Sequence, residues 1–177
     1  MKLKKNTIQK LKTAELVAKK DLKHIKEGPR NQVFLILDNI RSMYNVGAIF
    51  RTADAARVEK VFLCGITATP PRKEIEKTAL KTIDYLPWEY RDDSKKLVLE
   101  LKDRGVQVVA LEQTNISVSY KKFNFKKPLA IIVGHEVDGI SDNLLSLCDA
   151  AVEIPMHGIA NSLNVSTACG IILFHII

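Results

Sequence analysis

Short apolar runs alternate with stretches of helical periodicity along the chain after Pro29. The apolar runs at residues 33–37, 61–64, 106–111, 129–133 and 150–154 are typical of strands that are buried on both faces of a sheet. Helices are predicted at 45–57, at 94–104 with Ser94 as N-cap, at 141–147 with Ser141 as N-cap, and from Asn161 or Ser162 onwards. Strands that alternate with helices predict an α/β fold in which a mostly parallel sheet has helices on both faces.

The first 30 residues have a different pattern. Apolar residues recur near the helical period and form a stripe among lysines, and Gly28-Pro29 ends the predicted helix; the stripe is Ile8, Leu11, Ala18, Leu22 and Ile25. This segment holds ten Lys or Arg and three Asp or Glu, whereas the other 147 residues hold 17 of each sign, so it carries the whole net charge of +7. The excess favours a polyanionic partner, although a solvated helix face has the same composition. We expect a basic N-terminal helical extension over residues 1–30, docked by its stripe, and one domain over residues 31–177.

Composition excludes several classes of protein. No apolar run approaches the roughly 20 residues of a membrane-spanning helix, and the basic N-terminus lacks the apolar region of a secretory signal. Cys64, Cys148 and Cys169 are odd in number and far apart, so they are predicted to be buried thiols of a protein in the reducing cytoplasm. The four histidines show no metal-ligand spacing, so no metal is expected.

Polar side chains gather in three segments that follow predicted strands, at 38–47, 134–139 and 155–164. In parallel α/β sheets, ligands bind at the carboxyl ends of strands, so a site is expected here. The chain has no G-x-x-x-x-G-K-[ST] phosphate loop, no G-x-G-x-x-G after a strand and no G-x-S-x-G elbow. Each polar residue also has a plain structural role, with Asn45 as a helix cap, Glu136 as a surface acid, and Ser162 and Asn164 as caps of the last helix.

Three motifs together resemble those of one family. They are Asn45-Val-Gly-Ala-Ile-Phe-Arg51-Thr-Ala-Asp54, Ile131-Ile-Val-Gly-His-Glu-Val-Asp-Gly-Ile-Ser141, and Ile154-Pro-Met-His-Gly158 followed by Ser162-Leu-Asn-Val-Ser166. In this order and at these spacings they resemble the motifs of the SpoU/TrmH RNA methyltransferases, over about residues 31–177. The resemblance implies an S-adenosylmethionine-dependent enzyme that methylates a ribose 2′-hydroxyl of tRNA or rRNA. It also implies a deep trefoil knot in the C-terminal part, and a homodimer whose active site lies near the subunit interface.

The resemblance also assigns roles to positions. The implied contacts to S-adenosylmethionine are Leu111, Glu112, Gln113, Gly134, Glu136, Ile154, Met156, Leu163 and Asn164. Gly134 is expected to let the backbone approach the ligand, because it has no Cβ, and the apolar side chains offer a wall to the adenine. The implied catalytic residues are Asn45, Arg51, Glu136, Ser162 and Asn164. Arg51 matches the arginine regarded as the family's catalytic base; since a guanidinium has a pKa above about 12, stabilisation of a developing alkoxide or a phosphate contact is the alternative role.

RNA contacts are expected from Arg41 and Arg51 in the domain and from Lys4, Lys5 and Lys12 in the basic extension. Only about 30 residues precede the first predicted strand, so the large N-terminal RNA-binding domain of some rRNA-modifying relatives is not expected. This favours tRNA as the substrate, with a ribose of 23S rRNA as the alternative. Two other classes stay open: a knotted methyltransferase that modifies a base nitrogen, and a non-catalytic RNA-binding module.

Overall fold

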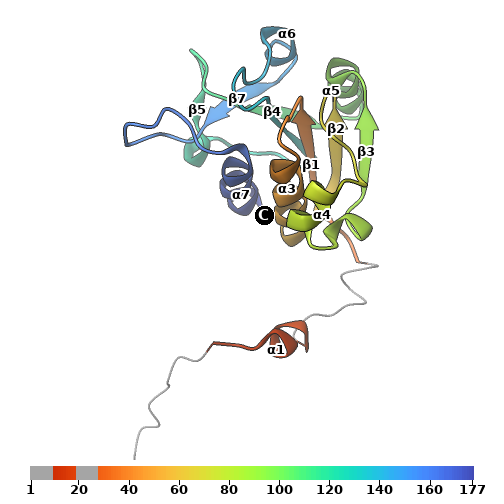
Figure 1. The fold of residues 1–177 in the computed structure, drawn as a ribbon. Coiled ribbons are helices and arrows are strands. Elements are labelled where there is room, and N and C mark those ends of the chain that lie inside the picture. Colours follow the sequence, from red (N-terminus) through yellow and green to blue (C-terminus); the bar gives the residue numbers. More distant parts are fainter. Residues whose placement is uncertain (1–9, 19–27) are drawn as a thin grey trace, which may run out of the picture.

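The computed structural model describes residues 10–18 and 28–177. In this part of the chain, seven strands form one sheet in the order β3-β2-β1-β6-β4-β7-β5, and all neighbouring strands run parallel (Figure 1). The strands are β1 (Asn31–Asp38), β2 (Val58–Cys64), β3 (Trp88–Arg91), β4 (Gln107–Leu111), β5 (Val118–Ser119), β6 (Leu129–Val133) and β7 (Ala150–Glu153). The helices are α1 (Thr13–Ala18), α3 (Met43–Ala55), α4 (Lys73–Ala79), α5 (Ser94–Asp103), α6 (Asp142–Leu145) and α7 (Val165–Ile176), with short 3₁₀ helices at Thr82–Asp84 and Tyr120–Lys122. The predicted α/β fold with a mostly parallel sheet is confirmed.

Helices cover both faces of the sheet, as the sequence predicts. Along β1, the side chains of Val33, Leu35 and Leu37 belong to a buried cluster that includes residues of α3, α4 and α7. The alternate residues Phe34 and Ile36 belong to a second cluster, which includes residues of α5 and α6. Because successive residues of a strand point to opposite faces, a strand covered on both sides is apolar at every position. The unbroken apolar run in β1 therefore places it at the centre of a three-layered structure (Figure 1).

The prediction that Ser94 caps α5 is wrong by one residue. The Asp93 carboxylate accepts hydrogen bonds from the backbone N–H groups of Lys95 and Lys96, at 2.9 and 3.2 Å, so Asp93 is the N-cap. A carboxylate at this position also meets the positive end of the helix dipole, which favours Asp over Ser.

The last helix begins later than predicted. Its N-cap is Asn164 rather than Asn161 or Ser162, so the segment before it extends as a loop past the end of β7. Ser141 stands at the N-cap of α6 as predicted, but its side chain makes no capping hydrogen bond and the helix ends at Leu145.

Gly28 and Arg30, which directly precede β1, contact the domain, and the predicted domain boundary near residue 30 stays a prediction. Arg57 donates through Nη2 to the carbonyl oxygen of Gly28 at 2.8 Å. Arg30 donates to the carbonyl oxygens of Val58 and Tyr85, at 3.2 and 2.7 Å. In the predicted extension, α1 is helical and Lys12 is exposed. Most of the apolar stripe and two of the predicted RNA contacts lie outside the described residues, so docking of this helix stays a prediction; these residues are Ile8, Leu22, Ile25, Lys4 and Lys5.

Two of the three cysteines are buried as predicted, and the third is not. Cys64 and Cys169 are fully buried, and burial raises the pKa of each thiol to about 12. Cys148 is only half-buried, which corrects the prediction, although burial still raises its pKa to about 11. No helix in the described parts of the chain is long and apolar enough to cross a membrane.

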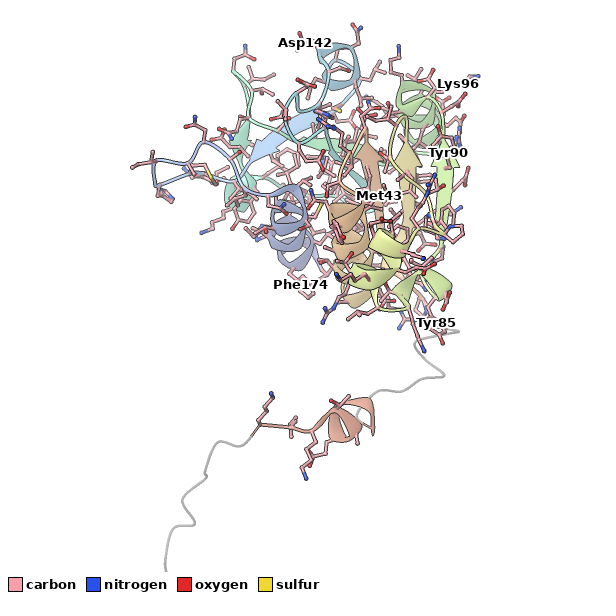
Figure 2. All side chains as sticks on the ribbon, viewed as in Figure 1. Met43, Tyr85, Tyr90, Lys96, Asp142 and Phe174 are labelled. Atoms are coloured by element: carbon pink, nitrogen blue, oxygen red, sulfur yellow. The ribbon has the colours of Figure 1, made fainter. Side chains whose placement is uncertain are left out.

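Several apolar side chains remain exposed on the surface of the described domain. Phe174 projects from the last turn of α7 with 56% of its surface exposed, and Tyr90 lies on the edge strand β3 (Figure 2). Tyr44, in the first turn of α3, is 51% exposed. Single exposed apolar residues are common, so these positions gain meaning only from their neighbours.

Candidate functional site

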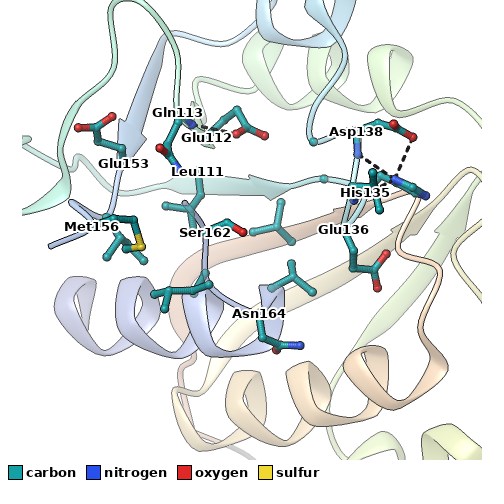
Figure 3. Close-up of a pocket in the computed structure, with 18 residues that line it drawn as sticks. Leu111, Glu112, Gln113, His135, Glu136, Asp138, Glu153, Met156, Ser162 and Asn164 are labelled. Atoms are coloured by element: carbon teal, nitrogen blue, oxygen red, sulfur yellow. Dashed lines mark hydrogen bonds and ion pairs between the residues drawn. The ribbon is translucent and has the colours of Figure 1, made fainter. Parts of the chain in front are cut away.

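A cavity of about 470 Å³ lies at the carboxyl ends of β4, β6 and β7, beside the N-terminus of α7 (Figure 3). Met156 and Glu153 lie on one side of it, and Glu136 and His135 lie on the other (Figure 3). The volume is in the range of small-molecule binding sites. The position agrees with the rule that parallel sheets bind ligands beyond the carboxyl ends of their strands.

All nine residues predicted to contact a cofactor line this cavity, and Ser162 lines it as well; the nine are Leu111, Glu112, Gln113, Gly134, Glu136, Ile154, Met156, Leu163 and Asn164. Eight further lining residues were not predicted, namely Val133, His135, Val137, Asp138, Gly139, Glu153, Val165 and Ala168. Most of them are direct chain neighbours of predicted residues. Ala168 lies one helical turn beyond Asn164, so the helical period is the signal that identifies it.

Gly134 allows a close approach within the chain itself, while its predicted approach to the ligand stays a prediction. The backbone turns back on itself here, since His135 and Gly139 exchange N–H to carbonyl hydrogen bonds at 3.2 and 2.9 Å. A Cβ on Gly134 would lie 2.5 Å from the carbonyl carbon of Gly139. The missing side chain therefore allows a close approach of the chain to itself, which shapes the cavity wall. Glu112 fixes the far end of the turn by accepting from the N–H of Ile140 at 3.1 Å.

The first turn of α3 directs Asn45 towards the cavity loop. Ser42 is the N-cap of this helix, and its hydroxyl accepts from the N–H of Asn45 at 3.3 Å. Because Ser42 is the cap, the side-chain amide of Asn45 is not used in capping. Its Nδ2 donates to Oε1 of Glu136 at 2.9 Å. The Glu136 carboxylate also accepts from the backbone N–H groups of Arg41 and Ser42, at 2.9 and 3.0 Å. One carboxylate thus ties the loop after β6 to the loop after β1.

Asn164 adds the third segment to this hydrogen-bonded chain. Its Oδ1 accepts from the N–H groups of Ser166 and Thr167, at 2.9 and 3.4 Å, which caps α7. Its Nδ2 donates to Oδ1 of Asn45 at 3.0 Å. Asn164, Asn45 and Glu136 therefore form a continuous chain of hydrogen bonds that joins all three sequence motifs at one side of the cavity.

The charge of Glu136 follows from these contacts. Burial alone would raise the pKa of this carboxyl, but the hydrogen bonds from Arg41, Asn45 and Ser42 outweigh burial and lower it. Hydrogen bonds that stabilise the carboxylate favour its ionised form. Glu136 is therefore a fixed negative charge at neutral pH.

Three predicted site residues of the domain do not line the cavity: Asn45, which bonds to the lining residues Glu136 and Asn164, Arg51 and Arg41. Arg51 is exposed on α3, two turns along the helix from the Ser42 cap, and it does not line the cavity. Arg41 contributes its backbone N–H to Glu136, while its side chain is exposed. The structure thus brings Glu136, Ser162 and Asn164 to the cavity, holds Asn45 beside it through hydrogen bonds to Glu136 and Asn164, and leaves both arginines on the adjoining surface.

Comparison with known proteins identifies the family. The model of the SpoU rRNA Methylase family matches residues 32–174. The chain is 33% identical over 156 residues to the tRNA (guanosine(18)-2′-O)-methyltransferase of Aquifex aeolicus, covering 88% of this chain and 73% of that protein. It is 34% identical over 169 residues to the 23S rRNA (guanosine-2′-O-)-methyltransferase RlmB of Photobacterium profundum, covering 94% of this chain and 68% of that protein. The chain spans 62% of the length of further relatives from Staphylococcus aureus.

A solved structure of an rRNA methyltransferase has a similar fold. The AdoMet-bound rRNA methyltransferase of Sinorhizobium meliloti has a TM-score of 0.77 and 31% sequence identity, over 82% of this chain and 56% of that chain. Fold and relatives place the protein among the RNA-modifying methyltransferases. Within that class, the chain belongs to the SpoU rRNA methylase family.

Proposed function

We propose that this protein transfers a methyl group from S-adenosylmethionine to the 2′-hydroxyl of a ribose in RNA. The observation that carries the proposal is the hydrogen-bonded chain of Asn164, Asn45 and Glu136 beside the cavity. It joins Asn45 to Glu136, which is 91 residues away along the chain, and to Asn164, which is 119 residues away. A merely structural N-cap or surface acid would not require this arrangement. The A. aeolicus and P. profundum relatives, both named as RNA 2′-O-methyltransferases, support the same reaction.

The cavity has the chemistry to hold S-adenosylmethionine. Leu111, Ile154 and Leu163 offer apolar surface for an adenine ring, and neighbouring backbone groups are available for its polar edge. The ionised Glu136 is available to offset the positive charge of a sulfonium. When bound, S-adenosylmethionine supplies an electrophilic methyl group. The AdoMet-bound structure of the S. meliloti relative supports this choice of cofactor.

The residues of the chain then have distinct roles in the proposed reaction. Asn45 and Asn164 hold the loops that border the cavity in one geometry, so that the ribose oxygen is aligned for attack. Ser162 lines the cavity and offers a hydroxyl for hydrogen bonding. Arg51 lies on the adjoining surface, where its permanent charge stabilises the developing alkoxide or a phosphate of the RNA. A cation in that role needs no change in its own protonation.

We propose tRNA as the substrate to test first, because the A. aeolicus relative is named as a tRNA enzyme; rRNA is the alternative that the P. profundum relative supports. The methyltransferase domain comprises residues 31–177, and residues 1–30 form a basic extension that contacts RNA phosphates through Lys4, Lys5 and Lys12, together with Arg41 and Arg51 of the domain.

We also propose that the protein is a cytoplasmic homodimer with a deep trefoil knot formed by its C-terminal part. The exposed side chains of Phe174 and Ile177, 56% and 45% accessible at the end of α7, support a subunit interface there. The free thiols support a reducing compartment. Sedimentation of the purified protein would then give the mass of two chains.

Calorimetric titration with S-adenosylmethionine tests the proposal on two variants of Asn164. An aspartate caps a helix as well as an asparagine does, but it has no N–H to donate to Asn45. Both Asn164→Asp and Asn164→Ala should therefore bind S-adenosylmethionine about 10-fold or more weakly, and Asn164→Asp, which keeps the capping oxygen, should lose less thermal stability than Asn164→Ala. Asn124→Ala, at an exposed position in the loop before β6, is the matched control.

The outcomes separate the candidate functions. Unchanged affinity in Asn164→Asp would contradict a role for the Asn45–Asn164 contact in the site. Failure of the folded wild type to bind S-adenosylmethionine, with or without RNA, would favour the RNA-binding module. Transfer of labelled methyl groups to unmodified tRNA or 23S rRNA transcripts, followed by alkaline hydrolysis, distinguishes ribose from base methylation, because a 2′-O-methyl group blocks cleavage at that nucleotide.

A further inference from the structure

Tyr44 is the exposed aromatic residue nearest in sequence to the hydrogen-bonded chain of the site. It directly precedes Asn45 in the first turn of α3, and 51% of its surface is exposed. The first turn of α3 therefore carries both the ring and the Asn45 amide, on consecutive residues whose side chains point in different directions. Asn45 itself is held by Glu136 and Asn164, which fixes the turn that carries the ring.

The side chains one turn beyond Tyr44 on α3 leave its ring uncovered, and α4 contacts the backbone of Tyr44. Positions 47 and 48, one turn further along α3, are Gly47 and Ala48, which are too small to cover a tyrosine ring. The hydroxyl of Thr78 in α4 donates to the carbonyl oxygen of Tyr44 at 3.1 Å. The ammonium group of the neighbouring Lys77 lies over the Tyr44 ring, 5.9 Å from its centroid. The result is an aromatic ring with a cation on one face.

Exposed cations lie in the loop before α3, on α3 and on α4. Arg41, Arg51 and Lys77 are all exposed, and in the described residues none of them forms an ion pair with a carboxylate. Unpaired cations around an exposed aromatic ring match a nucleic acid strand, since phosphates meet the cations and any base has a π face for the ring.

We propose that Tyr44 is the platform on which a base of the RNA substrate stacks, with Lys77 and Arg51 at adjoining phosphates, so that the ribose is presented at Asn45. This inference rests on the proposed function, because it assigns the ring to the same RNA. A second copy of the chain is a less suitable cover, since it would have to supply carboxylates to neutralise three cations.

Kinetics with unmodified tRNA and 23S rRNA transcripts test the proposal. Loss of one stacked base should raise the KM for RNA in Tyr44→Ala by about 10-fold to 100-fold, with the affinity for S-adenosylmethionine unchanged. Tyr44→Phe should keep the wild-type KM, whereas Tyr44→Leu, which has bulk but no π face, should behave like Tyr44→Ala. Lys77→Gln should give a smaller increase that shrinks at high salt.

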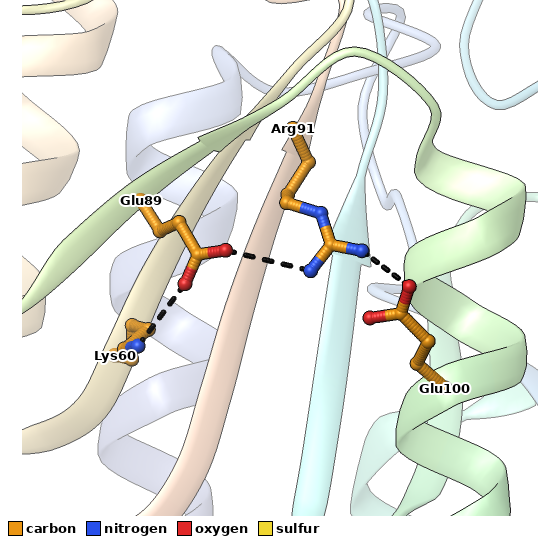
Figure 4. A network of polar contacts seen from close by, with 4 residues as sticks. All are labelled: Lys60, Glu89, Arg91 and Glu100. Atoms are coloured by element: carbon orange, nitrogen blue, oxygen red, sulfur yellow. Dashed lines mark hydrogen bonds and ion pairs between the residues drawn. The ribbon is translucent and has the colours of Figure 1, made fainter.

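Tyr90→Ala is the matched control. Tyr90 is also a half-exposed tyrosine, but it lies on β3 at the opposite end of the sheet from β7. Its strand is held independently by ion pairs in which Arg91 contacts Glu89 and Glu100, and Glu89 contacts Lys60 (Figure 4). The control loses the hydrogen bond from the Tyr90 hydroxyl to the carbonyl oxygen of Gly65, so its fold is checked by thermal unfolding, and it should keep the wild-type KM for RNA.

A direct optical readout does not depend on activity. The chain has a single tryptophan, Trp88, so Tyr44→Trp adds one reporter at the platform. Adding RNA should quench its fluorescence by stacking, beyond any change in the wild type. An unchanged KM and RNA affinity in Tyr44→Ala, in an enzyme that binds S-adenosylmethionine and methylates RNA, would overturn this inference and leave the proposed function standing. A change from dimer to monomer in Tyr44→Ala would overturn it in favour of a second copy covering the ring.

Discussion

The two polar atoms of the Asn164 amide have different partners. Oδ1 accepts from backbone N–H groups at the start of α7, which is the ordinary capping role that the sequence leaves open for this residue. Nδ2 donates to Asn45, a residue 119 positions away. The capping interpretation is therefore confirmed for Oδ1, while the functional role of this side chain, which would use Nδ2, stays a prediction.

At the residue scale, Glu136 offers a test of the hydrogen-bonded chain, because both of its carboxylate oxygens accept from N–H donors. In Glu136→Gln, one acceptor becomes an NH₂ group that points at the donors of Arg41, Ser42 or Asn45. We expect a loss of about 1 kcal/mol in the free energy of unfolding at pH 7, the low end for such groups because the side chain is partly exposed. For a chain of this size, that lowers Tm by roughly 2–4 °C.

The effect should depend on pH in a defined direction. The folded-state pKa of Glu136 lies below its ordinary value, so the unfolded chain takes up the proton first as the pH falls. The stability that Glu136 contributes is complete above about pH 5 and is lost as the pH falls through the folded-state pKa. Urea unfolding at a series of pH values should therefore show the difference between wild type and Glu136→Gln closing below about pH 4. Glu76→Gln, an exposed acid on α4, serves as control; equal stability of Glu136→Gln and wild type at pH 7 would refute the assignment.

At the scale of elements, α3 is packed against α4 and α7 through contacts at two helical glycines. A Cβ on Gly47 would lie 2.0 Å from the Thr78 hydroxyl and 2.3 Å from the carbonyl oxygen of Ile75 in α4. A Cβ on Gly170 of α7 would meet only the Thr52 methyl group, at an ordinary 3.7 Å. The same substitution should therefore have opposite effects at the two positions.

Gly47→Ala should lower the free energy of unfolding by a net of about 1–2 kcal/mol, since forcing α4 away costs more than the roughly 1 kcal/mol gained in helix propensity. Gly170→Ala should leave stability unchanged or raise it by up to about 1 kcal/mol. Thermal and urea unfolding of the pair measure both changes. A Gly47→Ala variant as stable as Gly170→Ala would show that the α3–α4 contact is looser than the structure indicates.

Elements that are buried on both faces could be predicted from the sequence, and those at the margins could not. The run of residues 33–37 lies inside β1, and the run at Leu129–Val133 coincides with β6, because covered central strands are continuously apolar. The missed strand β3 is an edge strand in which the aromatic residues Trp88 and Tyr90 alternate with the charged residues Glu89 and Arg91, so it has no apolar run. The missed β5 has only two residues, and α4 has only seven.

Part of the candidate site could likewise be predicted from the sequence, and part could not. The position rule for parallel sheets and the motif resemblance together locate the cavity, since both concern residues at strand ends. Neither identifies Ser42 as the cap that leaves Asn45 available for Glu136, nor the close approach that requires Gly134. Those features depend on contacts between segments that are far apart in the sequence, which periodicity and spacing do not encode.

At the scale of the whole molecule, the excess positive charge and the cavity lie in different parts of the chain. Residues 1–27 contain nine Lys or Arg and three Asp or Glu, a net charge of +6, whereas the cavity and its hydrogen-bonded chain lie entirely within residues 31–177. Among the described residues, the Gly28 carbonyl is held to the domain by Arg57, so a deletion that ends at residue 27 keeps this contact and those of Arg30. Affinity for RNA and affinity for the cofactor should therefore respond separately to changes in the extension.

Neutralising Lys4, Lys5 and Lys12 to glutamine tests this separation without changing the length of the chain. If each lysine contacts one phosphate, the slope of log K for RNA binding against log salt concentration should become shallower by about 2 to 3. The titration with S-adenosylmethionine should not change. The matched control removes the same charge from the domain surface, with glutamine at Lys121, Lys122 and Lys126, which are exposed in the segment before β6. Release of counterions from phosphates requires direct contact, so the extension variant alone should change the slope. An equal change in slope for both triple variants would mean that the total charge of the protein, rather than the extension, attracts the RNA.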